Sequence, residues 1–133
     1  MKTVLVTGGT RGIGLSTAKK FIDQGWNVYI TSRKDENLEA VLSDNSQLKG
    51  FVARADDLAA AAETCKKILD ETGSLDVLIN NAGTNPSGGS LLDVDLSAVQ
   101  KTWDVNLMGP LLWSRAAYKN ELSSAIMNIC SVG

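Results

Sequence analysis

Short runs of apolar and β-branched residues alternate along the chain with longer segments of helical spacing. The first run, TVLVT at 3–7, is almost continuously apolar, which is typical of a strand covered on both faces. Helical spacing follows it, and the apolar residues on one face are Ile13, Ala18, Phe21 and Ile22. Gly25 stands where this helix would end. The same patterns predict strands at 27–32, 50–55, 75–80 and 125–130 and helices at 35–42, 58–71 and 97–122. Asp95 or Ser97 would be the N-cap of the last helix.

Strands that alternate with helices imply right-handed crossovers and a parallel sheet. The alternation therefore predicts a Rossmann-type, doubly wound α/β fold with three layers, and a ligand at the carboxyl ends of the strands. The chain of 133 residues has no internal repeat, low-complexity tract or linker, and its length suits one domain. We expect residues 1–133 to form one domain, incomplete after its fifth strand.

Charge and composition exclude several classes of function. The 13 basic and 15 acidic side chains are scattered and leave a net charge of −2, so we expect no nucleic-acid partner and no binding to an anionic membrane. The first apolar run is too short to cross a bilayer, and the single Lys2 before it does not make an export signal. A cytoplasmic location is the expectation that follows.

The residue types present also limit the chemistry. The chain has no histidine, so neither a Ser-His-Asp triad nor an imidazole-ligated zinc site can be built from it. Cys65 and Cys130 lie far apart, which favours two reduced thiols over a disulfide or a metal site. We expect no metal site, and any acid or base must be Asp, Glu, Lys, Tyr or Cys.

A glycine-rich segment, TGGTRGIG at 7–14, joins the first strand to the first helix. Glycines let the backbone turn sharply and come close to a pyrophosphate, and the free N–H groups of a helix start favour its negative charge. The spacing is G-x-x-x-G-x-G with no Gly-Lys-Ser/Thr after it, so it is not a nucleoside triphosphate loop. The alternative is a tight turn without a ligand. The candidate contacts are Gly8, Thr10, Arg11, Gly12, Ile13 and Gly14.

Four motifs together resemble the N-terminal half of a short-chain dehydrogenase/reductase. They are TGGTRGIG at 7–14, NNAG at 80–83, Asn106 within DVNLMG and Ser131 within NICSVG, and they occur in the family's order from end to end of the chain. The resemblance implies hydride transfer between a nicotinamide ring and a small carbonyl or alcohol substrate. It also implies that Ser131 hydrogen-bonds that substrate, and that Asn106 supports a catalytic water and kinks its helix.

The NNAG motif closes the predicted fourth strand. Amide side chains can tie adjacent strand ends together, and Ala82 and Gly83 are small enough for a cofactor to approach the backbone. The resemblance makes Asn80, Ala82 and Gly83 candidate cofactor contacts. Without the resemblance, the motif would predict only a turn.

Basic residues follow the predicted second strand, where proteins that bind NAD usually carry an acidic residue against the ribose. This chain has Ser32, Arg33 and Lys34 there, and Arg11 in the glycine turn. Guanidinium groups suit the 2′-phosphate, so we expect NADP(H) to be preferred, with NAD(H) as the other option. The alternative is that Arg33 and Lys34 are an ordinary solvated pair.

Two aspartates follow the predicted third strand, where the resemblance implies an Asp followed by an apolar residue beside the adenine. Asp57 matches this pattern best because Leu58 follows it, and Asp56 remains an alternative if the connection is shortened. One of the two is expected to cap the next helix instead.

The chain departs from the family at its catalytic pair. The resemblance implies a Tyr-x-x-x-Lys acid/base pair after Ser131, but the only tyrosines are Tyr29 and Tyr118, and neither has a lysine four residues later. We expect the chain to bind the coenzyme but to transfer hydride poorly. We also expect a homo-oligomer that buries the strand at 125–130 or the helix at 97–122. The substrate itself is not specified.

Two other classes of protein compete with a reductase. One is a non-catalytic dinucleotide-binding or self-associating module, and the coding sequence after Gly133 separates it from an enzyme: an in-frame Tyr-x-x-x-Lys supports the enzyme and a stop codon supports the module. The other is a flavodoxin-like protein that binds FMN, which shares the order of elements but not the pair of motifs TGGTRGIG and NNAG.

Overall fold

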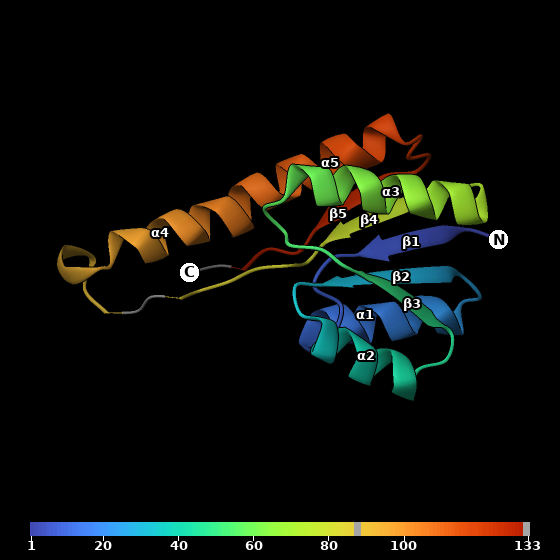
Figure 1. Cartoon of the computed structure of the whole chain (residues 1–133), viewed down its shortest axis with the longest axis horizontal. Helices are drawn as coiled ribbons and strands as arrows, with labels where there is room; N and C mark the ends of the chain where they lie inside the picture. The colour runs from blue at the N-terminus through green and yellow to red at the C-terminus, as the bar shows by residue number, and fades with distance from the viewer. Residues whose placement is uncertain (87–88, 132–133) are drawn as a thin grey trace.

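A single parallel sheet forms the centre of the molecule, shown by a computed structural model that describes residues 1–86 and 89–131 (Figure 1). Its five strands lie in the order β3-β2-β1-β4-β5, and all four strand pairs are parallel. The strands are β1 (Thr3–Val6), β2 (Asn27–Ser32), β3 (Leu48–Val52), β4 (Val77–Asn80) and β5 (Ala125–Asn128). This order reverses direction at β1 and confirms the doubly wound, Rossmann-type fold.

Helices cover both faces of the sheet and complete the three predicted layers. Figure 1 shows α1 (Gly12–Asp23) and α2 (Asp35–Asp44) on one face, and α3 (Leu58–Thr72) and α5 (Gly109–Lys119) on the other. A short 3-10 turn, η1 (Leu91–Asp93), precedes α4 (Leu96–Trp103), which extends beyond the sheet. Within residues 1–86 and 89–131, no helix has the length and hydropathy needed to cross a bilayer.

The sheet divides the hydrophobic core into two clusters. Along β1, Leu5 packs with the α3 and α5 side, whereas Val4 and Val6 pack with the α1 and α2 side, and all three are fully buried. Successive strand residues point to opposite faces, so a continuous apolar run is what a central strand with two covered faces requires. This explains why β1 was predictable from its sequence.

Several boundaries differ from the predictions at the strand ends. β3 begins two residues earlier than expected because Leu48 and Lys49 pair with β2, and it ends at Val52 because the chain then turns toward α3. β4 begins at Val77 rather than at 75, and just before it the Asp76 carboxylate, in place of a backbone carbonyl, accepts the Thr3 N–H at 2.7 Å. β5 ends at Asn128, two residues before the predicted end at 130.

The region predicted as one helix at 97–122 is helical, but it is not one regular α-helix and it ends earlier. The structure has α4, then a π-helical turn, η2 (Asp104–Met108), and then α5, which ends at Lys119. Asp95 is the N-cap of α4, because its carboxylate accepts the Ser97 N–H at 2.9 Å, and this decides between the two predicted caps. A π turn breaks the regular spacing of hydrogen bonds, which the apolar pattern does not register.

Candidate functional site

The carboxyl ends of β1 and β4 are locked together by the side chains of Thr7 and Asn81. The Thr7 hydroxyl accepts the N–H groups of Asn81 and Ala82, both at 3.1 Å. In return, Asn81 Nδ2 donates to the carbonyls of Thr7 at 3.2 Å and Gly8 at 3.0 Å. The NNAG segment therefore ties adjacent strand ends, as its amides predicted, and it holds the start of the glycine turn.

The glycines of this turn have different physical roles. A Cβ on Gly8, whose φ is +63°, would lie 2.9 Å from the Ala82 Cα. A Cβ on Gly14 would lie 2.4 Å from Asn81 Nδ2 and 2.5 Å from the Gly8 carbonyl. Gly12 has a φ of +55°, but a Cβ there would meet nothing within 4 Å. Gly8 and Gly14 thus permit close packing, whereas Gly12 permits a left-handed backbone beside open space.

The helix that leaves this turn begins without a side-chain cap. The N-cap Arg11 is in an extended conformation and its side chain makes no capping bond, and no acidic residue occupies the first turn of α1. Arg11 and Ile13 are exposed and Thr10 is half-buried. Uncapped N–H groups and the positive end of the helix dipole favour an anion at this position. The turn therefore fits the pyrophosphate that its sequence predicted.

The end of β2 brings a cationic segment to the same edge. Thr31 Oγ1 accepts the Gly8 N–H at 3.2 Å, which links β2 to the glycine turn. The buried Ser32 hydroxyl accepts the Lys34 N–H at 3.2 Å and donates to its carbonyl at 3.0 Å, so it shapes the turn after the strand. Arg33 is exposed beside it.

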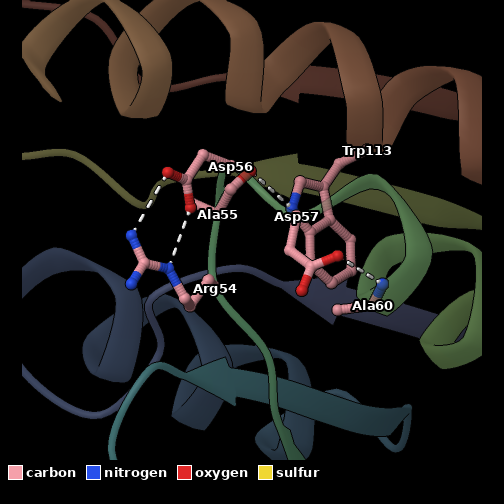
Figure 2. Close-up of polar contacts among 6 residues, drawn as sticks. All are labelled: Arg54, Ala55, Asp56, Asp57, Ala60 and Trp113. Carbon is pink, nitrogen blue, oxygen red and sulfur yellow. Dashed lines mark hydrogen bonds and ion pairs between the residues drawn. The ribbon is translucent and has the colours of Figure 1, made fainter. Parts of the chain in front are cut away.

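The two aspartates after β3 have separate contacts (Figure 2). Asp57 caps α3, since its carboxylate accepts the Ala60 N–H at 3.0 Å, and this confirms that one of the pair is an N-cap. Leu58 then begins α3 as an exposed residue. Asp56 instead pairs with Arg54, whose Nε and Nη2 donate to the two carboxylate oxygens at 3.1 and 3.3 Å.

The pKa of the Asp56 carboxyl lies below its ordinary value. The hydrogen bond from Arg54 lowers the pKa most, partial burial opposes the shift, and the charges of Arg54 and of Lys101 on α4 lower it further. Asp56 is therefore an anion at neutral pH. Arg54 was not among the predicted site residues. It meets Asp56 because the chain turns after β3, where the Asp57 N–H donates to the Arg54 carbonyl at 3.3 Å, and the sequence pattern did not predict this turn.

Trp113 of α5 contacts the connection between β3 and α3 from the core side of that connection. Its Nε1 donates to the Ala55 carbonyl at 3.1 Å, and the side chain is only 1% exposed (Figure 2). A Cβ on Gly109 would lie 3.0 Å from the same carbonyl, so α5 approaches this connection closely. The segment that carries Asp56 is thus held against the core.

Asn80 and Asn106 both use their side-chain amides in hydrogen bonds within the chain, although Asn80 is buried and Asn106 is exposed. Asn80 Nδ2 donates to Asn128 of β5 at 3.0 Å and to Ser114 of α5 at 3.3 Å, so it joins β4 to both elements. Asn106 lies in the π turn and exchanges two hydrogen bonds of 2.8 Å with the Thr84 backbone. This places Asn106 beside Gly83, whose Cβ would lie 3.5 Å from its Oδ1.

Ser131 is exposed, three residues after the end of β5. Its neighbours 132–133, like residues 87–88, lie outside the described residues. A wide hollow of about 450 Å³ lies elsewhere, between the ends of α1 and α2, and is lined by Lys19, Asp23 and Asp44. Helices of this fold end at the amino edge of the sheet, opposite the conserved location of ligands in doubly wound folds.

A family model described as short chain dehydrogenase matches residues 2–133. The chain belongs to this family. Among curated proteins, it is 33% identical to dehydrogenase/reductase SDR family member 4 of Pongo abelii over 122 residues, covering 86% of this chain and 43% of the relative. The chain thus spans about half the length of the curated relatives it matches.

Solved structures of family members agree with the fold and carry a coenzyme. The structure of ElxO with NADP bound superposes with a TM-score of 0.90 at 32% identity, covering 98% of this chain and 55% of that one. A short chain dehydrogenase from Burkholderia cenocepacia J2315 in complex with NADP superposes with a TM-score of 0.86 at 33% identity, covering 96% and 54%. The fold and its family therefore agree with an oxidoreductase.

Proposed function

We propose that this chain is the coenzyme-binding part of an NADP(H)-dependent short-chain oxidoreductase. When bound, the nicotinamide coenzyme supplies hydride exchange with a carbonyl or alcohol. The observation that carries the proposal is the uncapped start of α1, held against β4 by Thr7 and Asn81. The residues we assign to the pyrophosphate are Gly8, Thr10, Arg11, Gly12, Ile13 and Gly14.

The remaining assignments follow the carboxyl edge of the sheet. Ser32 shapes the turn that presents Arg33, and Arg33 with Arg11 would bind the 2′-phosphate. Asp56 would accept a hydrogen bond from the adenine, because the Asp57 carboxylate is used as a helix cap. The residues that we place along the rest of the coenzyme are Asn80, Ala82 and Gly83. At the reacting end, Asn106 would support a catalytic water and Ser131 would hydrogen-bond the substrate.

We predict that Arg33→Met weakens NADPH binding about tenfold or more while changing the affinity for NADH less than about threefold. The guanidinium donates charge-assisted hydrogen bonds to the 2′-phosphate, which NADH lacks. Isothermal titration calorimetry with both coenzymes measures the effect. Arg115→Met removes the same charge from an exposed position on α5 and serves as the control. Equal losses for both coenzymes would contradict a role in phosphate selection.

Neither tyrosine of the chain supports an acid/base role. Tyr29 is fully buried and donates a hydrogen bond to Glu71 at 2.6 Å, and burial followed by this bond raises its pKa far above the neutral range. Tyr118 is 79% exposed on α5 and precedes Ser131, whereas the family's acid/base tyrosine is expected after that serine. We therefore propose that residues 1–133 alone hold coenzyme without turning it over at the family's usual rates.

A self-associating module is the second candidate, and one surface favours it. Along α4, the π turn and α5, the exposed apolar side chains are Leu96, Val99, Trp103, Leu107 and Leu111. Among the described residues, β5 pairs only with β4, and Ile126 and Met127 are 41% and 49% exposed. Such a surface is typical of a contact between copies, so we include a homo-oligomer in the proposal. The cytoplasmic location expected from the sequence also remains part of the proposal.

One sample distinguishes the two candidates. If the chain is a coenzyme-binding part, NADPH binds it whether or not copies associate. If it is only a self-associating module, light scattering shows oligomers and calorimetry shows no heat with NADPH or NADH. Oxidation of NADPH by this chain with a panel of aldehydes and ketones, at rates of a family member run in parallel, would contradict the proposed lack of turnover.

A further inference from the structure

Arg54 and Asp56 form a two-pronged ion pair at the end of β3. The guanidinium uses Nε and Nη2 to reach the two carboxylate oxygens, at 3.1 and 3.3 Å (Figure 2). The Asp56 side chain is 24% exposed, whereas that of Arg54 is 64% exposed. Two parallel hydrogen bonds fix the plane of a carboxylate as well as its position. An exposed pair contributes little to stability, so its geometry is of more interest than its energy.

The surroundings of Asp56 are held on both sides. The preceding residue, Ala55, has its carbonyl bound by Trp113, and the following residue, Asp57, is fixed as the cap of α3. The side chain of Asp56 is then the part that could still rotate. In the structure, Arg54 is the hydrogen-bond partner that holds this side chain in its orientation.

The end of β3 lies beside the end of β2. Val52 is paired with Ser32, and the Ala53 N–H donates to the Ser32 carbonyl at 2.9 Å. In doubly wound folds the ribose of a dinucleotide lies at the end of β2, so its base continues past that point along the carboxyl edge. On the neighbouring connection, Asp56 is the carboxylate that does not cap α3, so it is the one we consider for the base.

We propose that Arg54 is a positioning residue that makes this site selective for adenine, by holding the Asp56 carboxylate so that it accepts a hydrogen bond from the base amino group. The proposal rests on the proposed function, since it needs a bound dinucleotide. Hypoxanthine carries a carbonyl where adenine carries the amino group. Two acceptors would then face each other, and an unmatched acceptor at a partly buried carboxylate is unfavourable.

Loss of the guanidinium would leave Asp56 with a different neighbour. Lys101 on α4 is the other cation whose charge acts on this carboxylate. Without Arg54, the carboxylate is free to turn toward Lys101 or toward water. An ammonium group is a point charge and does not hold both oxygens in a plane, so Lys101 does not replace the lost geometry.

The test compares base preference with phosphate preference in the same variants. Calorimetry gives dissociation constants for NADPH, NADH and the hypoxanthine counterpart of NADPH. We expect the unmodified chain to bind NADPH about tenfold or more tightly than its hypoxanthine counterpart. Arg54→Met should reduce this ratio to about threefold or less, through weaker NADPH binding, and leave the ratio of NADPH to NADH unchanged.

Matched variants separate positioning from a general loss of charge. Arg33→Met should do the reverse, changing the ratio of NADPH to NADH but not the preference for adenine. Arg115→Met should change neither ratio. Arg54→Lys keeps the charge and loses the fork, so we expect an adenine preference between those of the unmodified chain and Arg54→Met. Because Arg54 is mostly exposed, thermal unfolding should confirm that both of its variants fold.

Three results would overturn the proposal while leaving the proposed function intact. They are an unmodified chain that binds both bases equally, an Arg54→Met variant that keeps the full adenine preference, and an Arg54→Met variant that loses only its preference for NADPH over NADH. The last would make Arg54 a phosphate ligand. If the folded, unmodified chain binds none of the three dinucleotides, the proposed function fails, and the role of Arg54 fails with it.

Discussion

Replacing Gly14 by alanine is expected to abolish binding of NADPH, with an increase in the dissociation constant of about 100-fold or more. The new Cβ would lie 2.4 Å from Asn81 Nδ2 and 2.5 Å from the Gly8 carbonyl. That amide nitrogen already donates to the carbonyls of Thr7 and Gly8, so it has no free direction in which to move. The start of α1 must therefore shift away from β4, and the N–H groups that would bind the pyrophosphate move with it.

Calorimetry with NADPH measures the loss, and circular dichroism establishes that the variant is folded. Gly25→Ala is the matched control, because Gly25 has a φ of +83° with nothing within 4 Å of an added Cβ. That substitution strains the backbone by about 1–2 kcal/mol but lies far from the turn in sequence, so NADPH affinity should stay the same. Normal NADPH affinity in a folded Gly14→Ala variant would remove the glycine turn from the proposed site.

The second large effect is expected for Trp113→Ala, which should lower the free energy of unfolding by about 3–5 kcal/mol. Trp113 is 1% exposed and packs in the cluster that contains Leu5, Cys65 and Leu78. Its removal leaves a cavity beneath α5 and leaves the Ala55 carbonyl without its donor. Native domains of this size are stable by only about 5–15 kcal/mol, so the loss is a large fraction of the total. Urea denaturation measures it.

Trp113→Phe separates the packing of the ring from its hydrogen bond. Phenylalanine keeps most of the apolar volume but has no N–H, so the expected loss is smaller, about 1–3 kcal/mol. We also expect weaker NADPH binding in this variant, because the Ala55 carbonyl precedes Asp56 and holds its connection in place. If both substitutions lower stability equally, the hydrogen bond rather than the packing dominates, and the cavity argument is wrong.

The interruption of the long C-terminal helical region shows where sequence patterns stop being informative. The apolar spacing from 97 to 122 is continuous enough to predict one helix, yet a π turn divides it at Asp104–Met108. Within that turn, Asn106 bonds in both directions to the Thr84 backbone, 22 residues away along the chain. The local apolar pattern cannot contain a partner at that distance. The break was therefore expected only from the family resemblance at Asn106, and tertiary contacts give it its form.

The aspartates after β3 make the same point for the site. Their sequence predicts one cap and one base contact, and Leu58 favoured Asp57 for the base. Which of them caps α3 depends on where the helix begins in space, and the structure assigns the cap to Asp57. The pairing of Arg54 with Asp56 likewise depends on the path of the connection, which Trp113 holds from another element.

The sequence by itself determined the layers, the parallel strands and the glycine turn, because these follow from the period of the apolar residues and from what glycine alone permits. The bounds of β2 at Asn27–Ser32 agree with the prediction at both ends. Only the tertiary structure decided which polar side chains are engaged with one another at the carboxyl edge. Those choices come from contacts between distant segments, whose positions are known only once the sheet has brought them together.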